Sequence, residues 1–400
     1  MPRAEVTRSG PSFTTSPVPR VLHVVTVPLT LRFLRGQVDF MRARGFDVQV
    51  ASAPGPLLDE FCSTYGVTGH PIPMNRKITP RADAAAVAEL VRVLRGVRPD
   101  LVHAHTPKGG LVGMLAAAAA RVPARIYHMR GLPYLTASGP MRRLLWATES
   151  TSCGLAHRVI AVSESLKDAA QRARFVGASR IRVLAGGSSN GVDAFGRFDP
   201  ATAPVRSDAR RTFGLDPEHT VVTFVGRLVG DKGIAELVEA WQRLRHRPAT
   251  TLFVVGPYEE RDALSGELRA RIEGDPTIVH LPFTEDMPAV YAASDLVVLP
   301  TYREGFPNVP LEAASMGLPV VTTDAVGARD SVVDGVTGAV VTVRDSGALG
   351  RAIERYLDDE ALRRSHGAAG RKRVLDEFLP ERIWAELLTE YEALLDRARR

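Results

Sequence analysis

Apolar residues in the first half of the chain fall alternately into short continuous runs and into groups at helical spacing. The runs have the length of buried strands, and the groups between them have the period of amphipathic helices. The expected strands are residues 21–27, 46–52, 101–105, 125–129 and 159–162, and the expected helices are residues 33–44, 82–95 and 109–120. Strands that alternate with helices are typical of a parallel sheet built from βαβ units. We therefore predict a Rossmann-like domain in this half.

The pattern restarts after residue 190, with further strands expected near residues 221, 251, 278, 295 and 319. A chain of 400 residues, 45% of them hydrophobic, is longer than one hydrophobic core usually serves. The predicted fold class is α/β, with two Rossmann-like domains facing a cleft. We expect a disordered tail over residues 1–19, an N-terminal domain over 20–195, a C-terminal domain over 196–380 and a last helix within 381–400.

One segment of the second half, residues 304–312 (EGFPNVPLE), has the composition of a ligand-binding turn. Glu304 and Glu312 stand eight positions apart, with Gly305, Phe306 and Asn308 between them. The apolar run before the segment predicts a strand, and residues 311–316 predict a helix with Glu312 in its first turn. Ligands of open α/β sheets bind beyond the carboxyl ends of the strands. Carboxylates there are suited to accept hydrogen bonds from ribose or sugar hydroxyls.

A second candidate loop follows the predicted strand 220–225 and contains Gly226, Arg227 and Lys232. Glycine lets a backbone approach phosphate oxygens, a guanidinium binds two of them at once, and an ammonium adds a point charge. A pair of solvated basic residues is the simpler explanation of this loop alone. Taken with the first segment, however, it indicates a site for a nucleotide diphosphate.

The N-terminal half offers candidate groups for a second substrate. Residues 27–30 (VPLT) stand where a dinucleotide-binding protein has glycines, so we expect no NAD here and assign this half to the acceptor. His105 and Lys108 lie where a strand ends and a helix begins, a place suited to phosphate. His103 shares a strand face with His105, but the nearby sequence supplies no third ligand, so we expect no metal site.

Charge divides unevenly between the halves. Residues 1–195 carry 25 basic and 12 acidic residues, a net charge of +13, whereas the remainder carries 26 and 33, a net charge of −7. A basic domain fits an anionic membrane surface or an acidic substrate, although solvated arginines explain it equally well. Residues 131–149 combine Trp146 with Arg142 and Arg143. They form either a membrane-contacting amphipathic segment or an ordinary helix that buries its apolar side chains.

Several classes of protein are disfavoured. The longest apolar run, residues 111–120, has ten residues, about half of the roughly 20 needed to span a bilayer. No nucleic-acid-binding pattern accompanies the positive charge, so we expect no nucleic acid as a partner. Residues 1–19 lack the apolar core of a signal peptide, and the chain has only two cysteines, Cys62 and Cys153. We therefore expect a cytoplasmic protein, held peripherally at the inner face of the plasma membrane.

Three segments occur in the order found in the family-4 glycosyltransferases, which are retaining enzymes of the glycosyltransferase B fold. VGRLVGDKGI (225–234) resembles the phosphate-binding loop of that family, EGFPNVPLEAASMGLPVV (304–321) its two-glutamate signature, and SNGVD (189–193) the segment before its second domain. The resemblance extends from residue 20 to residue 395. It implies that Arg227 and Lys232 contact the diphosphate, Glu312 the ribose and Glu304 the transferred sugar. It also implies that the last helix crosses back to the first domain.

A narrower resemblance concerns the acceptor. Residues 105–117, 129–134 and 186–193 are similar to a bacterial branch that acts on undecaprenyl-diphosphate-linked sugars of surface polysaccharides. This implies transfer of a hexose or N-acetylhexosamine from a UDP-sugar to a polyprenyl-diphosphate-linked sugar, with His105, Lys108 and Asn190 on the acceptor side. Many members have a histidine that contacts the donor sugar; here either Arg130 or His128 takes that place.

The sequence offers no confident carboxylate nucleophile for a double displacement. We expect Arg227 and Lys232 to stabilise the leaving diphosphate electrostatically, without a metal or any other cofactor. Three alternatives remain open at this stage. They are transfer to a soluble secondary metabolite, a nucleotide-sugar 2-epimerase, and a nucleotide-regulated binding module without catalysis.

Overall fold

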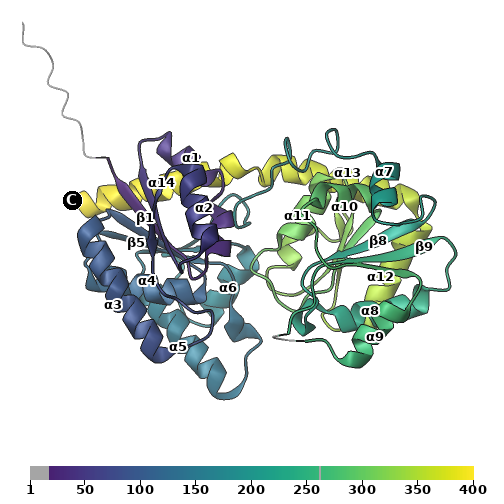
Figure 1. Ribbon diagram of the computed structural model, residues 1–400, viewed down its shortest axis with the longest axis horizontal. Helices are drawn as coiled ribbons and strands as arrows, with labels where there is room; N and C mark the ends of the chain where they lie inside the picture. Colours follow the sequence, from purple (N-terminus) through teal and green to yellow (C-terminus); the bar gives the residue numbers. More distant parts are fainter. Residues whose placement is uncertain (1–17, 261–262) are drawn as a thin grey trace, which may run out of the picture.

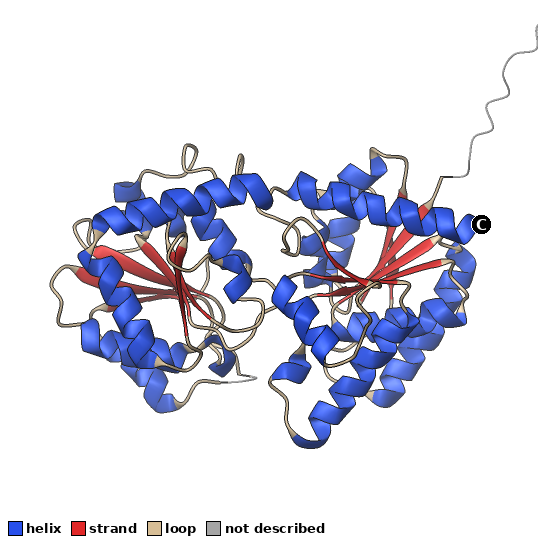
Figure 2. Cartoon of the chain, turned by 180° about the vertical axis from the view of Figure 1, so that it is seen from behind, coloured by secondary structure: helices blue, strands red, loops and turns tan. Residues whose placement is uncertain are grey.

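The computed structural model describes residues 18–260 and 263–400. The predicted tail, residues 1–19, lies outside the described residues except for its last two positions. Figure 1 shows two α/β units side by side, one formed by the first half of the chain and one by the second. Each unit is a parallel sheet with helices on both faces, as Figure 2 shows from behind. The prediction of two Rossmann-like domains is confirmed.

The N-terminal sheet has seven strands in the described residues, in the order β3-β2-β1-β4-β5-β6-β7. Its strands are β1 (Arg20–Val24), β2 (Asp47–Ser52), β3 (Thr68–Pro71), β4 (Leu101–His105), β5 (Ala124–Met129), β6 (Arg158–Ala161) and β7 (Ile181–Val183). The two edge strands, β3 and β7, were not predicted. Both are short and only partly buried, so they lack the continuous apolar run that marks the central strands.

The helices of this domain are η1 (Pro28–Leu34), α1 (Gln37–Arg42), α2 (Pro56–Tyr65), α3 (Pro80–Val97), α4 (Pro107–Ala119), η2 (Pro133–Leu135), α5 (Gly139–Leu155) and α6 (Glu164–Arg172). The single helix predicted over residues 33–44 is wrong, because the chain breaks between η1 and α1. Gly36 at the break has a φ of 71°, and a side chain there would overlap the ring of Trp384. The break therefore depends on glycine and makes room for the C-terminal helix.

The C-terminal sheet has the order β10-β9-β8-β11-β12-β13. Its strands are β8 (Thr220–Val225), β9 (Thr250–Val255), β10 (Ile278–Leu281), β11 (Leu296–Leu299), β12 (Val320–Thr323) and β13 (Gly338–Val341). Its helices are α7 (Arg206–Thr212), η3 (Gly230–Lys232), α8 (Ile234–Leu244), α9 (Gly266–Gly274), α10 (Met287–Ala293), α11 (Asn308–Ser315), η4 (Arg329–Ser331), α12 (Ser346–Asp358) and α13 (Glu360–Glu377). The unpredicted strand is again at an edge, β13.

The strand orders fix where ligands can bind. In each sheet the chain first builds strands outward on one side of its first strand and then returns to the other side. Strands β1 and β4, and likewise β8 and β11, are therefore neighbours at which the direction of winding reverses. Loops that leave the carboxyl ends of such a strand pair diverge and leave a crevice. Both predicted ligand-binding loops of the second half follow β8 and β11.

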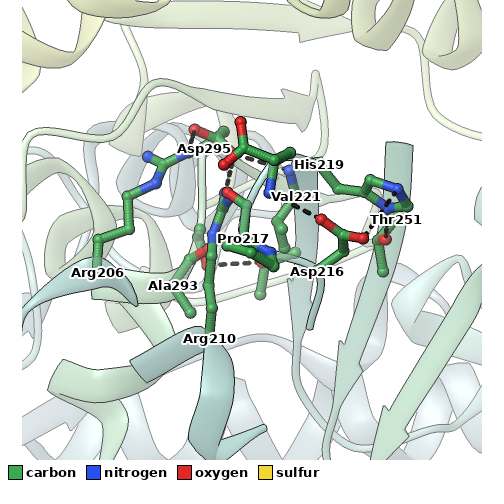
Figure 3. Close-up of polar contacts among 12 residues, drawn as sticks. Arg206, Arg210, Asp216, Pro217, His219, Val221, Thr251, Ala293 and Asp295 are labelled. Carbon is green, nitrogen blue, oxygen red and sulfur yellow. Dashed lines mark hydrogen bonds and ion pairs between the residues drawn. The ribbon is translucent and has the colours of Figure 1, made fainter. Parts of the chain in front are cut away.

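A buried charge cluster ties β8 to β11 at their opposite, amino-terminal ends (Figure 3). The carboxylate of Asp295 accepts hydrogen bonds from the amide of Val221 at 2.7 Å, from Arg210 at 2.6 Å and from Arg206. Arg210 is 1% exposed and also donates to the carbonyl oxygens of Ala293 and Pro217. The cluster holds the two central strands together.

The last helix, α14 (Pro380–Arg399), lies on the N-terminal domain (Figure 1). Its Trp384 packs against Phe40 of α1, with 5.5 Å between ring centroids, and its Tyr391 hydrogen-bonds to His103 of β4 at 2.7 Å. The chain thus starts in one domain, completes the second and returns to the first. Across the described part of the chain, no helix combines the length and apolarity that crossing a bilayer demands.

Candidate active site

The loops after β8 and β11 are joined directly to each other. The backbone carbonyl of Asp231 accepts hydrogen bonds from the amide of Tyr302 at 2.9 Å and from the hydroxyl of Thr301 at 3.2 Å. The carboxylate of Asp231 pairs with Arg303 at 3.0 Å. Two long loops that would otherwise move independently are therefore held as one surface.

Each basic residue predicted for the diphosphate has a carboxylate partner. Lys232 forms an ion pair with Glu304, and the two side chains are only 16% and 15% exposed. Arg227 pairs with Glu259 at 2.7 Å and is more open, with 46% of its side chain exposed. The structure thus brings Lys232 and Glu304 together, from loops 72 residues apart. A bound diphosphate would compete with both carboxylates for these cations.

Glu312 lies deeper than the sequence predicted. Helix α11 begins at Asn308, not at residue 311, so Glu312 is in its second turn and the prediction of a first-turn position is wrong. The hydroxyl of Tyr291 donates to Glu312 at 2.7 Å. Burial raises the pKa of the Glu312 carboxyl, and this hydrogen bond partly offsets the rise. One carboxylate oxygen is fixed by Tyr291, which orients the group from the protein side.

The other residues predicted for the donor loop differ in position. Phe306 is 5% exposed and packs on Phe378, with 5.4 Å between ring centroids, so its ring fills the junction of the domains. Gly305 admits no side chain, because a Cβ there would overlap the carbonyl of Arg130. Gly226 has a φ of 156° at the start of its loop, and Asn308 is the partly buried first residue of α11.

A cleft of about 420 Å³ separates these loops from the N-terminal domain. Arg227, Asp231 and Arg303 line one wall, and the other wall consists of the loops after β1, β3, β4 and β5. Residues of the second wall are Thr26, Val27, Thr30, Arg76, Thr106, Pro107, Lys108 and Pro133. The two domains therefore face each other across a polar cleft, whose lining includes the predicted residues Arg227 and Lys108 but not Lys232, Glu304 or Glu312.

Lys108 is in this cleft, at the start of α4. Its ammonium pairs with Asp83 at 2.6 Å and also donates to the carbonyl of Lys77. Arg76, on the loop after β3, is exposed at the same cleft. Thr106 precedes Lys108 with a φ of 66°, an unfavourable conformation for a β-branched residue. Such strain is frequent at ligand sites, because the surrounding structure must enforce it.

His105 is not on the cleft surface. It is 1% exposed and belongs to a histidine cluster with His23, His103 and His128. Ring nitrogens of His23 and His105 are 2.9 Å apart, and those of His103 and His128 are 3.2 Å apart. Burial is the main cause that lowers the pKa of all four, to about 3 for His23. The cluster is therefore a network of neutral rings.

The sequence near His103 and His105 offered no third potential metal ligand, but the fold brings His23 of β1 beside them. Ligand atoms of His23, His103 and His105 lie within 4.8 Å of one another, a spacing that a metal ion can bridge. These nitrogens already bond within the cluster, to Tyr391 and to Arg130. The positive charge of Arg130 beside the cluster also disfavours a cation there.

His128 is on β5 and Arg130 directly follows the end of that strand, and their side chains lie differently. His128 is 4% exposed, and its Nε2 has no hydrogen-bond partner among the described residues. Arg130 is only partly buried, and its guanidinium donates to Nδ1 of His105 at 3.2 Å and to the carbonyl of Ser189 at 3.0 Å. Of the two, Arg130 is nearer the domain junction, since its backbone carbonyl lies against Gly305.

The side chain of Asn190 hydrogen-bonds to two other parts of the protein. Its amide nitrogen donates to the carbonyl of Arg35 at 3.0 Å, and its oxygen accepts from Trp384 at 2.7 Å. The side chain thus links the interdomain segment to η1 and α14.

Sequence reasoning missed four residues that shape the site: Asp231, Arg303, Tyr291 and Glu259. Arg303 adjoins Glu304 and Asp231 adjoins Lys232, so both stood inside the predicted loops. Tyr291 and Glu259 lie on other elements, and no local spacing connects them to Glu312 or Arg227.

Two parallel-sheet domains that face each other across a polar cleft have the architecture of the glycosyltransferase B fold. Comparison with known proteins establishes the family. Residues 219–359 match the group 1 glycosyl transferases, and residues 31–187 match the glycosyl transferase 4-like domain. The chain belongs to the group 1, or family-4, glycosyltransferases.

The relatives include a glycosyltransferase of capsular polysaccharide biosynthesis and a galactosyltransferase with a diphosphoundecaprenol-linked acceptor. The chain is 33% identical over 377 residues to the capsular polysaccharide biosynthesis glycosyltransferase CapM of Staphylococcus aureus, covering 94% of this chain and 97% of CapM. It is 26% identical over 352 residues to the Escherichia coli UDP-Gal:alpha-D-GlcNAc-diphosphoundecaprenol alpha-1,3-galactosyltransferase, covering 86% and 89%. Its fold matches that of Anabaena HepE in complex with UDP and glucose, with a TM-score of 0.77, 22% identity and coverage of 94% and 100%.

Proposed function

We propose that this glycosyltransferase moves a sugar from a UDP-sugar to a polyprenyl-diphosphate-linked sugar, with retention of the anomeric configuration. The observation that carries the proposal is the joined pair of loops after β8 and β11. They carry two cations, Lys232 paired with Glu304 and Arg227 paired with Glu259, and Glu312 follows on α11. Cations suit the diphosphate, and carboxylates suit the hydroxyls of ribose and sugar.

In this proposal the reaction is driven by leaving-group stabilisation. Charge grows on the β-phosphate as the sugar departs, and Arg227 and Lys232 stabilise that charge. Glu304 loses its bond to Lys232 when the diphosphate takes the ammonium, and then accepts from a sugar hydroxyl. Glu312, already oriented by Tyr291, accepts from the ribose. The acceptor hydroxyl enters on the side from which the nucleotide leaves.

The acceptor diphosphate is assigned to the N-terminal wall. Lys108 and Arg76 are its basic residues at the cleft, and the name of the E. coli relative specifies a diphosphoundecaprenol-linked acceptor. His105 and Asn190 act indirectly in this scheme, because His105 is bonded to Arg130 and Asn190 holds Trp384.

A surface on α5 that suits contact with a membrane supports the proposal of a lipid-linked acceptor. On α5, Met141 is 50% exposed, and Leu144 and Trp146 are each 43% exposed. Arg142 and Arg143 are exposed between them. Apolar side chains flanked by arginines suit the interface of an anionic membrane. We accordingly place the protein peripherally on the inner face of the plasma membrane, through residues 141–146, called here the α5 surface.

The test is UDP release from a panel of UDP- and GDP-sugars, with and without a polyprenyl-diphosphate-linked monosaccharide, in the presence of EDTA. The proposal predicts release that depends on the lipid-linked acceptor, is specific to UDP-sugars and persists in EDTA. Release that depends only on a soluble acceptor would contradict the lipid assignment. Acceptor-free conversion of the sugar would instead indicate an epimerase, and binding of UDP without any release would indicate a non-catalytic module.

A further inference from the structure

Arg130 is a partly buried cation without an anionic partner. Within residues 18–260 and 263–400, no carboxylate forms an ion pair with it. Its contacts are Nδ1 of His105, the carbonyl of Ser189 and the face of Phe33, 4.8 Å from the guanidinium carbon. Burial lowers the pKa of Arg130 to about 9. Desolvation of a charge without a counter-ion is unfavourable, so an anion of a ligand would stabilise this side chain.

The histidine cluster positions the guanidinium but does not neutralise it. Because Nδ1 of His105 accepts from Arg130, the proton of His105 is on Nε2, which donates to Nδ1 of His23. Both rings stay neutral, since burial holds their pKa well below the usual range. Arg130 is therefore fixed in direction by a rigid acceptor and by Ser189.

The guanidinium of Arg130 has N–H groups that form no hydrogen bond with the described residues. A guanidinium has five N–H groups, and the contacts with His105 and Ser189 occupy at most three of them. The remaining N–H groups lie in a plane, which suits a carboxylate that binds through two oxygens. A positioned cation with free donors and no protein anion is a site for an anion of a ligand.

The position of Arg130 indicates which anion. Its backbone carbonyl lies against Gly305, the neighbour of Glu304, which contacts the transferred sugar in the proposed function. The diphosphate already has Arg227 and Lys232 on the opposite wall. In the proposed function the transferred sugar extends from that diphosphate toward Glu304 and Arg130.

We propose that Arg130 binds a carboxylate on the transferred sugar, so that the natural donor is a UDP-linked uronic acid. This inference rests on the proposed function. It narrows the donor to sugars with an oxidised C6, and it assigns His105 and His23 as positioning residues for the guanidinium.

The experiment measures donor binding by calorimetry in matched pairs that differ only at C6, without any acceptor. The pairs are UDP-glucuronate with UDP-glucose, UDP-galacturonate with UDP-galactose, and their N-acetylated counterparts, with UDP as reference. We expect at least one uronate to bind tenfold more tightly than its neutral partner. Arg130→Gln should abolish that preference and leave the Kd for UDP within twofold. Arg130→Lys should keep only part of it, because an ammonium lacks the planar fork.

Thermal melting shows whether each variant is folded, and Arg92→Gln, at an exposed arginine on α3, is the control for loss of one positive charge from the same domain. Equal or weaker binding of the uronate in every pair would overturn the inference and leave the proposed function intact. A tenfold loss of UDP affinity in Arg130→Gln would overturn it too, by assigning Arg130 to the diphosphate. Failure of the wild-type protein to bind UDP would overturn both the inference and the proposed donor.

Discussion

At the scale of single residues, the proposed donor site consists of charged side chains that already form ion pairs within the protein. Lys232 with Glu304, Arg227 with Glu259 and Arg303 with Asp231 each join a cation to a carboxylate, and the last two pairs line the cleft. These pairs keep the cations in place before a ligand arrives. Before the reaction, a diphosphate binds these cations only as far as it interacts with them more favourably than the carboxylates do. In the transition state the leaving diphosphate gains negative charge and therefore binds the same cations more strongly.

Lys232 gives the first prediction. Lys232→Ala should lower kcat at least about tenfold, equivalent to about 1.4 kcal/mol of transition-state stabilisation, because the leaving diphosphate loses one cation. Steady-state UDP release measures the effect, and the melting temperature checks the fold. Lys372→Ala is the matched control, since Lys372 is on the outer surface of α13, with 78% of its side chain exposed. Turnover equal to that of the wild type would remove Lys232 from the mechanism.

Local spacing made the donor loops predictable from the sequence, but not their partners. Gly226, Arg227 and Lys232, and likewise Glu304 and Glu312, stand in short segments after clear apolar strands. The histidine cluster was not predictable, because His23, His103 and His128 come from three strands that are neighbours only in the folded sheet. His105 looked like a surface ligand since it precedes a helix, yet all of β4 is buried.

At the scale of elements, the cleft is shaped by strands that are fixed at the far end of the sheet. Asp295 joins the start of β11 to the start of β8 through Val221 and Arg210 (Figure 3). The alignment of these two strands determines how the loops with Arg227 and Glu304 meet.

Breaking this cluster should lower the stability of the C-terminal domain. Asp295→Ala leaves the buried guanidinium of Arg210 without its anion, so we expect a loss of about 3–5 kcal/mol in the free energy of unfolding. Denaturant titration measures the loss. Asp208→Ala is the control, because Asp208 is on α7 with 61% of its side chain exposed. Similar stability of the two variants would show that the cluster contributes little.

Helix α5 carries a buried carboxyl group, that of Glu149, which predicts that the stability of the protein depends on pH. Glu149 is 2% exposed, and the hydroxyl of Tyr127 donates to it at 2.9 Å. Burial raises the pKa of Glu149 from 4.5 to about 8. Between these two values the folded chain keeps a proton that the unfolded chain releases, so stability falls as pH rises through this range.

Glu149→Gln removes this titration and keeps an oxygen that can accept from Tyr127. Urea unfolding at pH 5, 6.5 and 8 should show a flatter dependence on pH in the variant than in the wild type. Glu164→Gln is the control, because Glu164 is on α6 with 57% of its side chain exposed. The same decline with pH in wild type and Glu149→Gln would contradict a raised pKa for Glu149.

At the scale of the whole molecule, the two domains are joined by direct hydrogen bonds and by the last helix. The hydroxyl of Ser163, from the N-terminal domain, donates to the carbonyl of Gly305 at 2.7 Å, and the amide of Ser165 donates to Asp330 at 2.9 Å. Helix α14 adds the connection through Trp384 and Asn190. The two-domain architecture followed from two successive strand–helix series. The predicted boundary at residue 195 falls between β7 and α7, where neither sheet has a strand.

The proposed membrane contact concerns the whole molecule, because it depends on the α5 surface together with the net positive charge of the N-terminal domain. Wild-type protein should sediment with vesicles rich in phosphatidylglycerol and less with neutral phosphatidylcholine vesicles. Replacing Arg142 and Arg143 by Gln should weaken binding at least about tenfold, since each arginine contributes about 1 kcal/mol near an anionic surface. Replacing Met141 and Leu144 by Ser should weaken it further.

Phe283→Ser is the matched control, because Phe283 is 70% exposed but belongs to the C-terminal domain. It should leave vesicle binding unchanged. Binding that is insensitive to the changes on α5, or that falls equally in Phe283→Ser, would remove the α5 surface as the membrane contact.

The central claim is that the joined loops after β8 and β11 hold a nucleotide diphosphate in the interdomain cleft. A crystal structure with UDP bound tests it most directly. We predict the diphosphate on Arg227 and Lys232, with their bonds to Glu259 and Glu304 broken, and the ribose hydroxyls on Glu312. UDP bound outside this cleft, or bound with Lys232 still paired to Glu304 and the ribose away from Glu312, would contradict the account.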